Sequence, residues 1–185
     1  MNIVLTGMRG VGKSNISRRL CLLTKWPVLS TDLLIEYENG GKSIQEIMAG
    51  NGGDWRKLRD MEFQVVQKIS KFDNVIVDCG GGIIVDVADD GSEIYSERKV
   101  DLLKANGRVI FLEADIERLA AKVKGDRRRP TLDETKSAEE VMQRRLPYYR
   151  QAADLILEVE GMGRRKAARK LYRQIFQQDP PDVTL

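Results

Sequence analysis

One stretch of the chain decides the fold, Gly7-Met8-Arg9-Gly10-Val11-Gly12-Lys13-Ser14. It matches the pattern G-x-x-x-x-G-K-[ST], in which backbone N–H groups and the lysine surround the phosphates of a nucleotide. The pattern has this meaning only between a strand and a helix, and here an apolar run at 2–6 precedes it and a segment of helical period at 13–24 follows it. The alternative is a chance glycine turn, which composition would produce in about one chain of this length in a hundred. We therefore predict a phosphate-binding loop (P-loop) at residues 7–14.

The residue types of this loop suit phosphate binding. Glycines let backbone N–H groups turn toward phosphate oxygens, Lys13 supplies positive charge between the β- and γ-phosphates, and Ser14 is a ligand for Mg²⁺. Near the other end of the chain, Arg164 and Arg165 either stack near adenine or face water, and we include Arg165 among the expected contacts. The predicted nucleotide-binding residues are Gly7, Arg9, Gly10, Val11, Gly12, Lys13, Ser14 and Arg165.

Short apolar runs alternate with longer segments of helical period along the chain. Strands are predicted at 2–6, 28–30, 74–79, 108–113 and 155–159. Helices are predicted at 13–24, 32–39, 43–49, 54–71, 95–106, 115–124, 137–150 and 163–177. Because nearly all-apolar strands that alternate with helices form parallel sheets covered on both faces, we predict an α/β fold: a doubly wound, five-stranded parallel sheet flanked by helices. The length suits one domain, placed at 1–178, with a C-terminal tail at 179–185.

Two polar stretches are predicted to be mobile loops. Residues 86–92 are acidic, and residues 125–135 are basic and contain Pro130. The second stretch is predicted to be a mobile lid, although its arginines at 127–129 are also compatible with simple solvated charge.

The composition excludes several kinds of site. Since the chain has no histidine and two cysteines, it cannot form a Ser-His-Asp triad, a His-ligated metal site or a Cys₄ zinc site, and any general base must be a carboxylate. The formal net charge of 31 − 28 = +3 is weaker than in dedicated nucleic-acid-binding proteins. No apolar run approaches the roughly 18 residues of a membrane span. We expect a cytoplasmic monomer that binds neither nucleic acid nor membrane.

Candidate acceptor-binding residues follow the second and third predicted strands. In doubly wound folds ligands bind at the carboxyl ends of the strands, so Asp32 and the glycines at 80–82 are expected beside the P-loop. The run from Val75 to Asp78 looks like a Walker B strand, and residues 78–81 also fit the D-x-x-G pattern of a GTPase. However, the chain has no N-K-x-D tetrapeptide to read guanine, which disfavours a GTPase.

The ordered set of motifs resembles the shikimate kinase family. Besides the P-loop, the matching segments lie at 32–36, 41–47, 58–62, 80–82, 129–132 and 145–149, in the family's order and across residues 1–176. No single segment after the P-loop is specific, whereas the ordered set is. The resemblance implies transfer of the ATP γ-phosphoryl group, with Mg²⁺, to the 3-hydroxyl of shikimate.

The resemblance also implies a role for each site residue. Arg59 and Arg145 would bind the substrate carboxylate, Asp32 would orient the hydroxyl and accept its proton, and Arg129 on the lid would neutralise charge on the transferring group. The implied catalytic residues are Lys13, Asp32 and Arg129, and the implied substrate contacts are Asp32, Arg59, Gly80, Gly81, Gly82 and Arg145.

Two of these residues have an alternative, purely structural interpretation. Asp32 could simply cap the helix that follows it. Arg59 could pair with Glu62 on a solvated helix face.

The chain departs from the family pattern in two places. The family carries Asp-x-Asp after the second strand, where this chain has Ser30-Thr31-Asp32. Our hypothesis is that Asp78 replaces the missing magnesium carboxylate, although strand alternation could equally point Asp78 away from the site. The acidic insertion at 86–93 either reshapes the acceptor pocket or decorates the surface. These departures leave open another P-loop small-metabolite kinase, of the gluconate or nucleoside monophosphate type, or an inactive nucleotide-binding regulatory domain.

Overall fold

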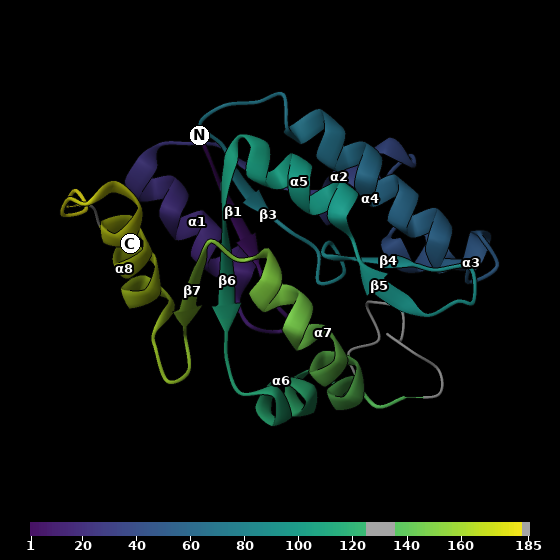
Figure 1. The fold of residues 1–185 in the computed structure, drawn as a ribbon. Helices are drawn as coiled ribbons and strands as arrows, with labels where there is room; N and C mark the ends of the chain where they lie inside the picture. The colour runs from purple at the N-terminus through teal and green to yellow at the C-terminus, as the bar shows by residue number, and fades with distance from the viewer. Residues whose placement is uncertain (125–135, 183–185) are drawn as a thin grey trace.

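The main sheet is parallel throughout and has five strands in the order β2-β3-β1-β6-β7 (Figure 1). The computed structural model describes residues 1–124 and 136–182. Its strands are β1 (Asn2–Thr6), β2 (Val28–Ser30), β3 (Ile76–Asp78), β6 (Gly107–Glu113) and β7 (Leu155–Glu158). The predicted doubly wound, five-stranded parallel sheet is therefore confirmed.

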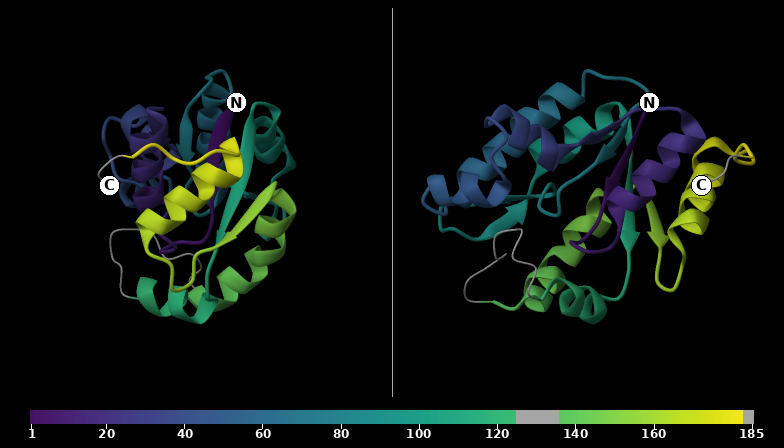
Figure 2. Two further views of the ribbon diagram at one scale, coloured as in Figure 1. Left: turned by 90° about the vertical axis from the view of Figure 1, so that its left-hand side faces the viewer. Right: turned by 180° about the vertical axis from the view of Figure 1, so that it is seen from behind.

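Helices cover both faces of this sheet, with α1 and α8 on one face and α5 and α7 on the other (Figures 1 and 2). The described helices are α1 (Lys13–Thr24), α2 (Thr31–Glu38), α3 (Ile44–Gly50), α4 (Trp55–Ile69), α5 (Glu97–Ala105), α6 (Ile116–Val123), α7 (Ala138–Ala152) and α8 (Arg164–Phe176). Most of them begin at a residue that can cap a helix; α3 and α7, for example, begin with capping boxes at Ser43 and Ser137. These local signals explain why the predicted helix bounds are close to the observed ones.

The core lies between the sheet and its helices. The central strands have no exposed side chains, and Ile3, Leu5, Ile76 and Ile110 are completely buried. A rigid sheet of this kind holds the carboxyl ends of β1, β2 and β3 in fixed positions, which matters because the candidate site residues follow these ends.

An unpredicted antiparallel hairpin, β4 (Val85–Val87) and β5 (Glu93–Tyr95), follows the glycine turn. The prediction of a loop over 86–92 is wrong at its start, because Asp86 and Val87 belong to β4. β-branched and aromatic residues at 85, 87, 94 and 95 favour strands, and the turn between them closes at Gly91, whose φ is +84°. The predicted helix at 95–106 begins later, at Glu97, because Tyr95 pairs with Val85 in the hairpin.

The predicted lid at 125–135 lies outside the described residues. Within the described parts, 1–124 and 136–182, no helix has the length and apolar character to cross a membrane.

Candidate active site

The P-loop joins the end of β1 to the start of α1, as predicted. Gly7, Gly10 and Gly12 have φ values of +147°, +85° and +105°, a region that side chains rarely adopt, so this backbone path requires glycine. The Nζ of Lys13 donates to the carbonyl oxygens of Gly7 (2.7 Å) and Met8 (3.2 Å). The loop therefore has the glycine backbone, the lysine and the helix N-terminus that a nucleotide phosphate needs.

Cationic side chains from two other helices lie against the P-loop. Lys122 of α6 donates to the carbonyl oxygen of Gly10 at 2.8 Å. A Cβ on Gly12 would come within 2.5 Å of Nε of Arg164 in α8, so this guanidinium lies directly on the loop. Arg165, which we included among the nucleotide contacts, is exposed. The assignment of Arg165 stays a prediction, and Arg164 is the arginine that the fold brings beside the P-loop.

Asp32 is not the cap of the helix that contains it. Ser30 caps α2, and its hydroxyl oxygen accepts from the backbone N–H of Leu33 at 3.4 Å. A Cβ on Gly80 would overlap Oδ1 of Asp32, so the carboxylate lies against the glycine turn, which Thr31 holds by accepting from the N–H of Gly80 at 2.7 Å. The capping interpretation is therefore wrong, and Asp32 faces the expected position of the acceptor.

One pocket brings most of the predicted acceptor contacts together. It has an open volume of about 640 Å³, part of which is continuous with solvent. Its lining includes Asp32, Arg59, Gly81, Gly82 and Arg145, and Gly80 lies directly behind Asp32. Met8 and Arg9 of the P-loop also line the pocket, so an acceptor bound there would lie next to the nucleotide phosphates.

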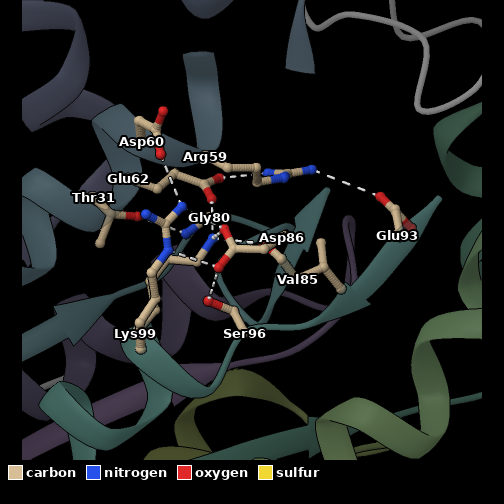
Figure 3. Close-up of polar contacts among 12 residues, drawn as sticks. Thr31, Arg59, Asp60, Glu62, Gly80, Val85, Asp86, Glu93, Ser96 and Lys99 are labelled. Atoms are coloured by element: carbon tan, nitrogen blue, oxygen red, sulfur yellow. Dashed lines mark hydrogen bonds and ion pairs between the residues drawn. The ribbon is translucent and has the colours of Figure 1, made fainter. Parts of the chain in front are cut away.

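Arg59 is held by a buried ion-pair network rather than exposed on a helix (Figure 3). Its Nη1 donates to Oε1 of Glu62 at 2.7 Å, and both residues are about 95 % buried or more, with exposures of 3 % and 5 %. Lys99, whose side chain is completely buried, donates to Oε2 of Glu62 at 2.8 Å and to the carbonyl oxygen of Val85 at 2.6 Å. The interpretation of a solvated Arg59–Glu62 pair is therefore wrong.

Two features fix the Arg59 guanidinium against the pocket. Trp55 lies beneath it, with 5.2 Å between the guanidinium carbon and the ring centroid. On the other side, a Cβ on Gly82 would overlap Nη1 of Arg59, so only glycine allows this approach.

Burial lowers the pKa of Lys99, although the nearby Glu62 carboxylate opposes this effect.

Arg145 is paired with Glu93, a residue of β5 that sequence reasoning did not assign to the site. The Nε of Arg145 donates to Oε2 of Glu93 at 2.9 Å, and its Nη2 donates to Oε1. Arg144 donates to the same Oε2 at 2.8 Å. Burial acts to raise the pKa of Glu93, but hydrogen bonds and charges from Arg145, Arg144 and Arg59 outweigh it and hold this pKa below its ordinary value. Glu93 is therefore an ionised carboxylate on the arginine expected to bind the substrate.

Tyr149 joins the P-loop to the glycine turn. Its single hydroxyl proton is shared between the carbonyl oxygens of Gly81 (2.6 Å) and Gly7 (3.2 Å). Its ring stacks on Phe111 of the central sheet, with 5.0 Å between centroids. The two halves of the site thus share one buried side chain.

The candidate magnesium ligands lie at the same edge of the sheet. Ser14 is in the first turn of α1, and Asp78 is the last residue of β3, in register with Leu5 of β1 and Ser30 of β2. Asp78 is 7 % exposed. A hydroxyl and a carboxylate are hard oxygen donors, which suit Mg²⁺ bound to nucleotide phosphates.

The remaining site residues fall into two groups. Arg129, predicted to act from the lid, lies outside the described residues. Glu93, Lys99 and Tyr149 were not assigned a role. Lys99 nevertheless had a detectable signal, because it is a charged residue on the buried stripe that it forms with Val100 and Leu103 of α5.

Comparisons with known proteins identify the family of this chain. A family model described as shikimate kinase matches residues 9–176. The chain is 42% identical over 171 residues to the shikimate kinase of Leptospira biflexa serovar Patoc, covering 92% of this chain and 93% of that protein. It is 41% identical over 174 residues to the shikimate kinase of Leptospira borgpetersenii serovar Hardjo-bovis, covering 94% and 97%.

Solved structures share the fold. The shikimate kinase of Acinetobacter baumannii in complex with shikimate superposes with a TM-score of 0.79 at 24% identity, covering 95% of this chain and 93% of that chain. The shikimate kinase of Aquifex aeolicus superposes with a TM-score of 0.73 at 21% identity, covering 96% and 97%.

Proposed function

The chain belongs to the shikimate kinase family, and from this premise we propose how its own residues phosphorylate shikimate. The protein is an ATP-dependent kinase of the shikimate pathway that uses Mg²⁺. The open question is which side chains perform each task in a chain that has serine in place of the family's first aspartate.

The observation that supports the proposal is the shared pocket. Asp32, Arg59 and Arg145 line one cavity together with Met8 and Arg9 of the P-loop. Shikimate carries a carboxylate and several hydroxyls, so it needs fixed cations for the first and an anionic group near the reacting hydroxyl. The pocket lining contains the guanidinium groups of Arg59 and Arg145 and the carboxylate of Asp32, which are the kinds of group that this acceptor needs.

Each residue then has one task in the transfer. Arg59 and Arg145 bind the acceptor carboxylate, which places the 3-hydroxyl beside Asp32. Asp32 orients this hydroxyl and accepts its proton as the oxygen bonds to the γ-phosphorus and ADP leaves. Lys13 of the P-loop, with Arg129, neutralises charge on the transferring group. Backbone groups of Gly80, Gly81 and Gly82 approach the acceptor.

Mg²⁺ supplies further positive charge at the β- and γ-phosphates when bound. We propose that Ser14 holds it directly and that Asp78 takes the place of the missing aspartate. The remaining nucleotide contacts are assigned to Gly7, Arg9, Gly10, Val11, Gly12 and Arg165.

We further propose a single kinase domain over residues 1–178, with a lid at 125–135 and a tail at 179–185, that functions as a cytoplasmic monomer. The support for the domain bounds is that the seven strands and eight helices of the described residues all lie between residues 2 and 176.

The test is steady-state ADP release with Mg²⁺–ATP and one of three acceptors: shikimate, gluconate or a nucleoside monophosphate. Shikimate is expected to stimulate ADP release strongly, whereas the other two should leave it at the rate measured without acceptor. Lys13→Ala is the control for nucleotide-dependent turnover and should abolish the stimulation. Stimulation by gluconate or a nucleoside monophosphate instead of shikimate would overturn the proposal.

A further inference from the structure

The hairpin places a carboxylate where the acceptor's carboxylate is expected. Glu93 is the first residue of β5. Its side chain binds Arg145 through both carboxylate oxygens, in the fork geometry that a guanidinium offers to a carboxylate. Oε1 of Glu93 also lies 3.7 Å from Nη2 of Arg59. Glu93 thus touches both arginines that we assign to the substrate carboxylate.

The edge of the Arg145 guanidinium formed by Nε and Nη2 is already occupied by Glu93. The Nε and Nη2 of Arg145 donate to Glu93, and its Nη1 donates to the carbonyl oxygen of Gly81 at 3.2 Å. The Arg145 side chain is 4 % exposed, so water cannot readily take over these bonds. A carboxylate from outside can bind this Nε–Nη2 edge of Arg145 with both oxygens only if Glu93 leaves it.

Arg59, by contrast, has unused capacity. Its Nη1 is held by Glu62, while its Nε is buried with no hydrogen-bond partner in the described parts of the chain. The protein itself therefore supplies acceptors for only some of the N–H donors of these two arginines. This arrangement suits a site in which one carboxylate is exchanged for another.

The hairpin does not need Glu93 to hold its place. Asp86 of β4 accepts from Arg98 at 2.8 Å and from Ser96 at 2.6 Å, and it lies 3.4 Å from Nζ of Lys99. Arg56 of α4 donates to the carbonyl oxygen of Ala88 at 2.9 Å. These contacts fix the hairpin to α4 and α5, so the side chain of Glu93 can leave the arginines while the strands stay paired. Figure 3 shows the contacts of Asp86 with Ser96 and Lys99.

We propose that Glu93 is a specificity-determining residue, an internal carboxylate that occupies the arginine pair until the acceptor's carboxylate displaces it. This inference rests on the proposed function, because it takes shikimate as the acceptor. An acceptor that carries a carboxylate replaces the lost ion pair between Glu93 and the arginines with an equivalent one. An acceptor without a carboxylate cannot form such a pair, so the exchange raises the selectivity of the pocket for acids.

The alternative role for Glu93 is to position Arg145, and the two roles predict opposite results. If Glu93 competes with the acceptor, Glu93→Gln weakens the competitor and lowers the KM for shikimate by about tenfold. If Glu93 positions Arg145, the same change loosens the guanidinium and raises this KM. The turnover number kcat is expected to stay within about twofold, since Glu93 does not touch the reacting hydroxyl.

The experiment measures kcat and KM for shikimate and for its carboxamide, in which a neutral amide replaces the carboxylate. In Glu93→Gln the KM for shikimate should fall about tenfold, and the KM for the carboxamide should change by less than about twofold. Glu93→Asp keeps the charge but shortens the side chain by one methylene, and should lower the KM for shikimate several-fold. Glu97→Gln, which removes an exposed carboxylate from the first turn of α5, is the matched control and should keep both wild-type KM values.

A KM for shikimate that is unchanged or higher in these variants would overturn the inference. Thermal unfolding of each variant shows whether it is folded. If Glu93→Gln is not folded, the KM for shikimate of Glu93→Asp is the measurement that tests the inference. A failure of the proposed function is visible separately, in the wild type, as no shikimate-dependent ADP release; that result would overturn the inference as well.

Discussion

At the start of α2, one side chain caps the helix and a different one faces the acceptor pocket. Ser30 caps the helix, which leaves the Asp32 carboxylate against Gly80 and facing the pocket. We predict that Asp32→Asn lowers kcat by about 10²–10⁴-fold, because the amide cannot accept the proton of the hydroxyl, while the KM for ATP stays within about twofold. Steady-state kinetics with each substrate varied in turn measures both effects.

Ser30→Ala is the control for this prediction. It should lower the free energy of unfolding by about 1 kcal/mol through loss of the helix cap, with kcat close to that of the wild type. If Ser30→Ala and Asp32→Asn gave the same kinetic loss, Asp32 would not be the residue that handles the proton.

Asp78 offers a second prediction at this scale. It is buried at the end of β3, in register with Ser30, which stands where the family has a carboxylate. Asp78→Asn should raise the Mg²⁺ concentration for half-maximal activity by about tenfold, because a neutral amide contributes no charge to a divalent cation. ATP binding without Mg²⁺ is the internal control and should be nearly unchanged. An unaltered Mg²⁺ titration would show that Asp78 does not replace the missing aspartate.

The site residues that could be predicted are those that stand in the segments resembling the shikimate kinase family. Asp32, Arg59 and Arg145 are of this kind, and the structure brings them into one pocket. Glu93 and Lys99 could not be found in the same way, because their partners are far away in sequence: Glu93 is 52 residues from Arg145, and Lys99 is 37 residues from Glu62. Only the folded chain shows that these charges meet.

At the scale of elements, helices were predicted well and the hairpin was missed, for a physical reason. Helix period, capping residues and capping boxes are local signals that survive without tertiary contacts. The hairpin strands have three residues each, and acidic residues interrupt their apolar pattern. Their stability comes from Arg98, Lys99 and Arg56 on neighbouring helices, which a local pattern does not contain.

Asp86 makes the hairpin sensitive to acid. Partial burial acts to raise its pKa, but Arg98, Lys99 and Ser96 outweigh burial and lower the pKa from 3.8 to about 2. Because the folded state holds the charged form more strongly, the stabilisation is complete above pH 3.8 and is lost as the pH falls through about 2. At pH 6 the wild type should exceed Asp86→Asn by about 1–2 kcal/mol in the free energy of unfolding, and this difference should shrink toward pH 2.

Urea unfolding at a series of pH values measures this difference. Asp101→Asn, which removes an exposed aspartate from α5, is the matched control and should follow the wild-type profile. A difference between wild type and Asp86→Asn that stayed constant with pH would show that packing, rather than charge, is what the substitution changes.

At the scale of the whole molecule, the P-loop and the acceptor pocket belong to different strand–helix units that must keep a fixed relative position. The central sheet provides most of this rigidity, since β1 and β3 are direct neighbours. Tyr149 of α7 adds a link that crosses the sheet edge, from Gly7 at the start of the P-loop to Gly81 in the glycine turn. In-line phosphoryl transfer depends on positioning, so this link is expected to affect turnover as well as stability.

Tyr149→Phe tests this coupling, because it removes only the hydroxyl and keeps the ring that stacks on Phe111. The carbonyl oxygens of Gly81 and Gly7 then lose the one hydroxyl proton that they share, and the free energy of unfolding should fall by about 1–2 kcal/mol. The turnover number should fall several-fold with little change in the KM for ATP, since the P-loop itself is intact. Tyr148→Phe, at the neighbouring position on α7, removes a hydroxyl that does not join these two turns and should leave kcat near the wild-type value. Equal kinetic effects of the two substitutions would mean that the sheet alone sets the spacing between the nucleotide and the acceptor.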